Sequence, residues 1–208
     1  MGRALGRSRS ASGVIRLSGL SQRSLASIFN HCVLDESRAG FRDAALLGLM
    51  AGAGLSPSEV IALEWRDVEI DRGVLTISGR SRFGRAVALQ ETTLSQLLRR
   101  WSDVALRRDG SVLTSTSEPS SGQPLSRAAV YRIVSRRARA AGFSGLLPSD
   151  LAHHYWWDLK RQHASGRTSC SLVTSEDGVV QFLSPALDIR VEFASRPEEA
   201  ELAFVMDG

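Results

Sequence analysis

Several residue types are scarce in this 208-residue sequence, and their scarcity excludes several classes of protein. The two cysteines, Cys32 and Cys170, are far apart and in no metal-ligand spacing, so the sequence predicts neither a disulfide framework nor a cysteine metal site. No apolar run approaches the length that crosses a bilayer. The first residues, MGRALGRSRSASG, are basic and serine-rich without an apolar stretch, unlike a secretory signal. We therefore expect a soluble, cytoplasmic protein.

Lysine is almost absent, because Lys160 is the one lysine among 26 basic residues and the other 25 are arginines. The arginines have two explanations: the codon usage of a GC-rich genome, or contact with phosphates, which a planar guanidinium binds well. Their distribution is uneven. Residues 167–208 hold three arginines against eight acids, whereas the rest of the chain has 23 bases against 14 acids. This pattern predicts a basic, polyanion-binding body followed by an acidic tail.

Hydrophobic residues make up 43% of the chain, which is typical of a globular domain with an ordinary core. Apolar residues recur at helical spacing in five segments, and they alternate in three short runs between Val68 and Leu89. The five segments are residues 20–34, 41–54, 92–106 and 127–142 and the helix opened by Ser149 and Asp150. The predicted fold class is α+β: mainly helical, with a small three-stranded antiparallel β-sheet.

The composition suggests three parts. Residues 1–19 are expected to be a flexible basic arm, residues 20–166 the main domain, and residues 167–208 a divergent acidic tail. The stretch SLVTSEDGVVQFL in the tail is typical of a β-hairpin. The alternative is that the tail is non-native sequence, for instance after a change of reading frame.

The stretch GLSPSEV, residues 54–60, predicts a helix start. Ser56 is a suitable N-cap, Pro57 fits the first helical position, and Glu59 can complete a capping box. We expect this helix to run to about Glu64.

Several motifs occur in an order that resembles the catalytic domain of the tyrosine recombinase (phage integrase) family over about residues 20–166. They are the RDAALL helix, the G-L-x-x-S-E-V helix start, L-x-W-x-D-V, the glycine-rich hairpin, the AAG helix end and D-L-x-H at the start of a late helix. The resemblance implies the family's fold and an association with DNA integration and recombination. The helical DNA-binding domain that normally precedes this one is not expected here.

The resemblance also implies where catalytic residues should lie, and most are missing. Family members attack a DNA phosphate with a tyrosine, while arginines and a lysine stabilise charge or protonate the leaving oxygen. Four of the family's positions are occupied here by other residues: Ser56 for an arginine, Arg80 for the hairpin lysine, Ser149 for a histidine and Ala152 for the second arginine. The fifth position keeps its histidine, His153. The nucleophile's expected segment, in the tail, has no tyrosine. Tyr131 and Tyr155 are expected to pack or to face DNA.

Six arginines are the predicted DNA-binding residues. Three lie on or beside the hairpin loop, and three recur on one face of a helix: Arg80, Arg82, Arg85, Arg132, Arg136 and Arg139. The competing reading is a solvated surface. His153, His154 and His163 lack the spacing of metal ligands, so no metal and no cofactor are expected. Trp156 and Trp157 suit either core packing or a partner surface.

The function predicted from the sequence is a DNA-binding, catalytically degenerate integrase-like protein whose partners are double-stranded DNA and, in addition, an intact recombinase or a copy of itself. Two alternatives stay open. One is an active recombinase completed by partner subunits; the other is a protein-interaction module or a decayed mobile-element fragment.

Overall fold

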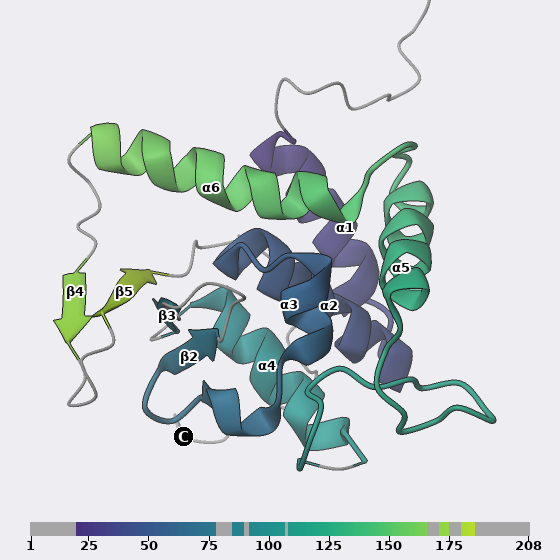
Figure 1. Ribbon diagram of the computed structural model, residues 1–208. Coiled ribbons are helices and arrows are strands. Elements are labelled where there is room, and N and C mark those ends of the chain that lie inside the picture. Colours follow the sequence, from purple (N-terminus) through teal and green to yellow (C-terminus); the bar gives the residue numbers. More distant parts are fainter. Residues whose placement is uncertain are drawn as a thin grey trace, which may run out of the picture.

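The computed structural model describes residues 20–77, 85–89, 92–106, 108–165, 171–174 and 180–185. This part of the chain is mainly helical, as predicted, with the strands gathered at one end (Figure 1). The helices are α1 (Gln22–Val33), α2 (Arg38–Ala53), α3 (Pro57–Ala62), the 3-10 helix η1 (Trp65–Asp67), α4 (Thr93–Val104), α5 (Arg127–Ala140) and α6 (Pro148–Ala164). The strands are β1 (Val68–Glu69), β2 (Val74–Ile77), β3 (Arg85–Ala88), β4 (Ser171–Thr174) and β5 (Val180–Pro185).

Side-chain caps begin five of the helices, because a hydroxyl oxygen accepts a backbone N–H that the first turn leaves unpaired. The capping residues are Ser21, Ser37, Ser56, Thr92 and Ser126. Helix α6 begins at Pro148, one residue before the predicted start, and the Asp150 carboxylate accepts the N–H of Leu147 at 2.8 Å. Helix α3 ends at Ala62, earlier than predicted, because Leu63 is extended and Glu64 forms a β-bridge with Ser111.

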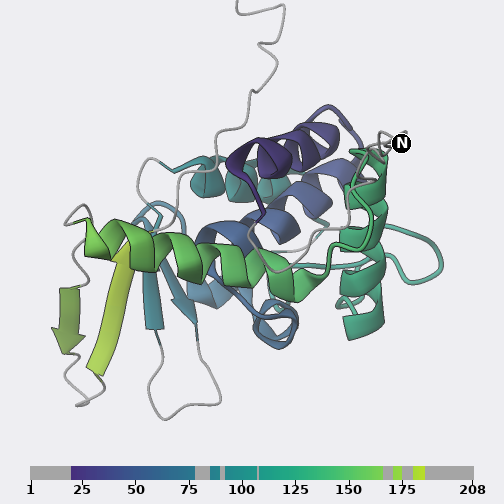
Figure 2. The same cartoon turned by 90° about the horizontal axis from the view of Figure 1, so that it is seen from above.

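The predicted three-stranded antiparallel sheet is confirmed as β1–β2–β3, with Val68 opposite Leu75 and Leu75 opposite Val87. Two further strands extend it, giving the order β1-β2-β3-β5-β4. Strand β5 pairs in parallel with β3, and β4 pairs antiparallel with β5. Figure 2 shows β4 and β5 at the left of the molecule, near the left end of α6. Whether residues 167–208 are a separate or non-native part stays a prediction.

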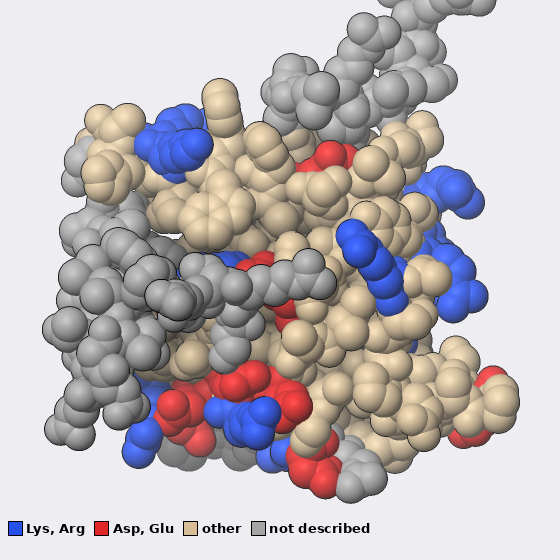
Figure 3. Space-filling view, viewed as in Figure 1, with Lys and Arg blue, Asp and Glu red and all other residues tan. Residues whose placement is uncertain are grey.

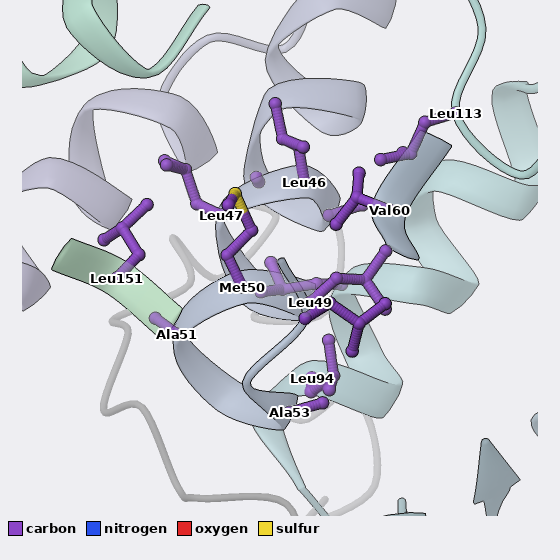
Figure 4. Close-up of a cluster of buried hydrophobic side chains, with 14 of the residues drawn as sticks. Leu46, Leu47, Leu49, Met50, Ala51, Ala53, Val60, Leu94, Leu113 and Leu151 are labelled. Atoms are coloured by element: carbon purple, nitrogen blue, oxygen red, sulfur yellow. The ribbon is translucent and has the colours of Figure 1, made fainter. Parts of the chain in front are cut away.

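Helix α2 lies at the centre of the fold and contacts α1, α3, α4, α5 and α6. Every residue from Arg42 to Ala53 is buried, which explains why this alanine- and leucine-rich segment has no polar face. Figure 4 shows Leu46, Leu47, Leu49 and Met50 of α2 among apolar side chains of other elements. Burial of one leucine side chain contributes about 1.5–3 kcal/mol, so this helix supplies much of the hydrophobic stabilisation.

No helix in the described part of the chain is long and apolar enough to cross a bilayer.

Candidate nucleic-acid interface

The turn between α2 and α3 is built around Ser56. The Ser56 hydroxyl accepts the Glu59 N–H at 3.3 Å, and the Glu59 Oε2 accepts the Ser56 N–H at 2.7 Å. The predicted capping box is therefore confirmed. The Ser56 side chain is used to begin α3, at the position where the family resemblance expects a cationic group.

A guanidinium from β3 reaches this turn. Arg85 Nη1 donates to Glu59 Oε1, and Nη2 donates to the carbonyl of Gly54 at 3.1 Å. The guanidinium carbon of Arg85 lies 5.4 Å from the ring centroid of Trp156 in α6, a cation–π distance. We call Gly54, Ser56, Glu59, Arg85 and Trp156 the Ser56 corner, because their contacts join the end of α2, α3, β3 and α6.

The charges of Arg85 and Glu59 in the Ser56 corner neutralise each other. The side chain of Arg85 is 19% exposed, and it faces the carboxylate of Glu59 and a carbonyl at the end of α2, where the helix dipole favours a cation. Burial opposes ionisation of Glu59, but hydrogen bonds from Arg85 and Ser56 hold the pKa of Glu59 below its ordinary value. Arg85 was predicted to contact DNA; that contact stays a prediction, and it requires the guanidinium to leave these partners.

Helix α6 contacts the same corner through Trp156, and it also carries Ser149, Ala152 and His153, the positions that the resemblance predicts to be catalytic. Trp156, which covers Arg85, lies one turn after Ala152 and two turns after Ser149, so the three residues share one helix face. Ala152 is half-buried, whereas Ser149 and His153 are exposed. The side chains at Ser56, Ser149 and Ala152 are uncharged.

The hairpin arginines Arg80 and Arg82 lie outside the described residues. Their role in DNA binding stays a prediction.

Helix α5 carries the other predicted basic surface. Arg132 and Arg139 are exposed, and the side chain of Arg136 is 61% exposed. In Figure 3, basic side chains gather at the right, over α5, while acids and bases alternate at the lower left. The three arginines recur on one helix face, opposite the buried Val130.

Arg136 and its neighbour Arg137 also reach inward, to Asp43 of α2. The fully buried Asp43 accepts from Arg136 Nη2 at 2.9 Å, from Arg137 Nε at 2.7 Å and from Arg42 Nε at 2.7 Å. Arg137 Nη2 also lies 2.6 Å from an oxygen of Asp35. Burial opposes ionisation of Asp35, yet hydrogen bonds from Ser37 and Arg137 lower its pKa. Arg136 therefore has a structural role that its spacing in the sequence did not reveal.

The two tyrosines differ in burial. Tyr155 is fully buried, packs edge-on against Trp156 with ring centroids 5.1 Å apart, and fills the space beside Gly54. Tyr131 is half-buried on α5. Neither tyrosine is presented as an exposed nucleophile.

His154 is buried, with its Nε2 3.6 Å from the carboxylate of Asp158. Among the described residues, no group of three or more His, Cys, Asp or Glu side chains could hold a metal ion.

A buried central helix, a capped α3, an antiparallel hairpin and a late helix packed back onto the α2–α3 turn define a fold of the tyrosine recombinase catalytic-domain type. The chain belongs to the phage integrase family, which it matches over residues 19–165. The family resemblance inferred from the sequence motifs is therefore confirmed.

Named relatives give the same assignment. The chain is 34% identical over 119 residues to the tyrosine recombinase XerC of Xanthomonas campestris pv. campestris, covering 56% of this chain and 35% of the relative. It is 30% identical over 125 residues to XerD of Neisseria meningitidis serogroup B, covering 59% and 42%. The chain thus spans less than half the length of these curated relatives.

Solved structures show the same fold at low sequence identity. The lambda integrase catalytic core aligns with a TM-score of 0.58 and 15% identity, covering 82% of this chain and 99% of that one. The XerA recombinase aligns with a TM-score of 0.58 and 18% identity, covering 69% and 51%. A lambda integrase dimer bound to a core site aligns with a TM-score of 0.56 and 16% identity, covering 74% and 56%.

Proposed function

We propose that this chain binds double-stranded DNA through α5 as a recombinase-family protein in DNA integration or recombination, and that it does not cleave DNA strands by itself. The observation that carries the second part is the Ser56 corner, where a serine caps a helix and the neighbouring guanidinium is held by a carboxylate, a carbonyl and an indole ring.

Strand cleavage through a covalent phosphotyrosine needs fixed cationic donors around a five-coordinate phosphorus. Ser56 and Ala152 are neutral at the two positions expected to supply arginines, and removal of a single such donor typically slows a reaction by about 10²–10³. Arg85 supplies a cation nearby, but Glu59 neutralises it. The buried Tyr155 cannot reach a phosphate without local unfolding of its packing against Gly54.

The charge and exposure of α5 support duplex binding. Arg132 and Arg139 are exposed and form no ion pair with any other residue that the structure describes, so their guanidinium groups are available for phosphate contacts. Solved relatives of the same fold include DNA complexes: a XerH recombinase is bound to its difH substrate, and a lambda integrase dimer to a core site. By analogy with the dimer, we infer that the partners here include a second copy or an intact recombinase. We further propose that the chain acts in the cytoplasm and without a cofactor.

The test is the affinity for a labelled random duplex across a salt series. Each lost phosphate contact reduces the slope of log affinity against log salt by about 0.9. The double variant Arg132→Ala/Arg139→Ala is expected to bind more weakly and to lower that slope by up to about 2. Arg136 is left intact, because its contact with Asp43 would confuse lost binding with lost folding.

The matched control removes two charges from another surface. The side chains of Arg66 and Arg72 are 79% and 81% exposed, and both residues lie near the sheet. The double variant Arg66→Ala/Arg72→Ala loses the same net charge and is expected to keep the wild-type slope. Equal effects of the two double variants would show a non-specific charge effect and reject α5 as the interface; absence of duplex binding at low salt would reject the DNA-binding proposal.

A further inference from the structure

One face of α6 combines an exposed tryptophan with basic side chains. His153, Trp157, Lys160 and Arg161 follow one another at intervals of four, three and one residues, so they form one continuous stripe along the helix. All four are exposed, and Trp157 is 61% exposed, the second largest value among the exposed large apolar side chains of the described part. We call these four residues the α6 stripe.

The stripe is separate from the surfaces already described. The inner face of α6 is buried through Leu151, Tyr155 and Leu159, and Trp156 turns towards Arg85 at the Ser56 corner. Trp157 is the neighbouring residue and lies about 100° further round the helix. In Figure 1, α6 lies along the upper edge of the molecule with α5 beyond one end, so the stripe and the basic face of α5 are on different elements.

The charge of the stripe is positive. Lys160 is exposed, and the side chain of Arg161 stays 71% exposed although its Nη2 lies 2.6 Å from Asp158 Oδ1. Asp158 itself is buried, so it presents little negative charge at the surface. In Figure 3, basic side chains stand at the upper left over the C-terminal half of α6. Basic residues near a helix C-terminus also stabilise the helix dipole, but that role does not require an exposed indole beside them.

We propose that the α6 stripe binds single-stranded DNA, with an unpaired base stacked on Trp157 and the adjacent phosphates on Lys160 and Arg161. Aromatic platforms beside basic side chains are the usual means of binding single strands, because every base has a face that can stack. In a closed duplex the base faces are already stacked on one another, so Trp157 discriminates in favour of unpaired segments. Such binding is independent of duplex binding through α5.

The experiment measures the anisotropy of labelled oligothymidylate with the full chain, together with the quenching of tryptophan fluorescence. We expect oligothymidylate to quench the tryptophan fluorescence of the wild type. The variant Trp157→Ala is expected to bind about ten-fold more weakly and to lose most of this quenching. Lys160→Ala is expected to weaken binding less and to reduce its salt dependence. Leu34→Ala is the matched control: Leu34 is 69% exposed at the end of α1, so this variant also removes an exposed apolar side chain. It is expected to bind like the wild type.

Three results would overturn the inference. The first is equal affinity of Trp157→Ala and the wild type for oligothymidylate, with circular dichroism showing that the variant is folded. The second is a wild type that binds no oligothymidylate at low salt. The third is a Trp157-dependent dimer in size-exclusion chromatography without any effect on oligothymidylate binding, which would assign the stripe to a second copy. The Arg132→Ala/Arg139→Ala variant separates the two proposals, because it should lose duplex affinity and keep oligothymidylate affinity.

Discussion

Replacement of Asp43 by alanine tests the buried ion network between α2 and α5. Asp43 is fully buried and accepts hydrogen bonds from Arg42, Arg136 and Arg137. Its loss leaves the side chains of Arg42 and Arg137, which are 6% and 11% exposed, without their shared counter-charge. Removing one partner of a buried pair costs about 3–5 kcal/mol.

The expected cost lies near the lower end of that range. Arg137 keeps its contact with Asp35, and Arg42 keeps the carbonyl of Thr114 at 3.3 Å. We expect Asp43→Ala to lower the free energy of unfolding by about 3 kcal/mol, which corresponds to a fall in Tm of roughly 6–12 °C for a domain of this size.

Two arginine variants test the buried and the exposed partner of Asp43 separately. Arg137→Ala is expected to cost nearly as much as Asp43→Ala, because it leaves Asp43 short of a buried donor. Arg136→Ala is expected to cost less than about 1 kcal/mol, since its side chain is 61% exposed and its pairing is weakened by solvent. Urea unfolding followed by circular dichroism measures all three. A buried ion network is contradicted if the free energy of unfolding of Asp43→Ala lies within about 1 kcal/mol of the wild type, or if the two arginine variants are equally stable.

Three further predictions concern the Ser56 corner and α6. Gly54 has φ +66°, and an added Cβ would overlap the Tyr155 ring. Gly54→Ala should therefore lower the free energy of unfolding, measured in urea, by at least about 2 kcal/mol. A neutral effect would contradict this packing. The lowered pKa of Glu59 contributes stability above pH 4.5 that is lost as the pH falls through the lowered value; Tm against pH should show this slope in the wild type and a weaker slope in Glu59→Gln. Burial lowers the pKa of His154, so the stability of the protein should fall as the pH drops below 6.5. In His154→Asn, the Tm should no longer fall in this way. If the variant and the wild type have the same dependence of Tm on pH, His154 does not contribute.

Features encoded over short distances could be predicted from the sequence. The capping box of Ser56 and Glu59 depends on residues three positions apart, so it was visible as a local pattern. The strands around Val87 followed from alternation, and α2 from the helical spacing of its apolar residues. The resemblance to the family then implied the fold that these elements form.

The pairings that decide the chemistry of the site could not be predicted in this way. Arg85 meets Glu59 across 26 residues, and Arg137 meets Asp35 across 102, so neither partner can be identified from local spacing. Helical periodicity placed Arg136 on a basic face but could not show its contact with the buried Asp43. A buried acid within an apolar helix was the one signal that a distant arginine would be needed.

A nicked suicide duplex, whose cleavage product cannot be religated, tests whether the chain binds duplex DNA without cleaving it. After incubation with the full chain, a native gel reports binding and a denaturing gel reports a covalent protein–DNA product. We expect a salt-sensitive shift in the native gel and no covalent band. A covalent band that disappears in Tyr131→Phe or Tyr155→Phe would contradict this expectation and establish a working nucleophile.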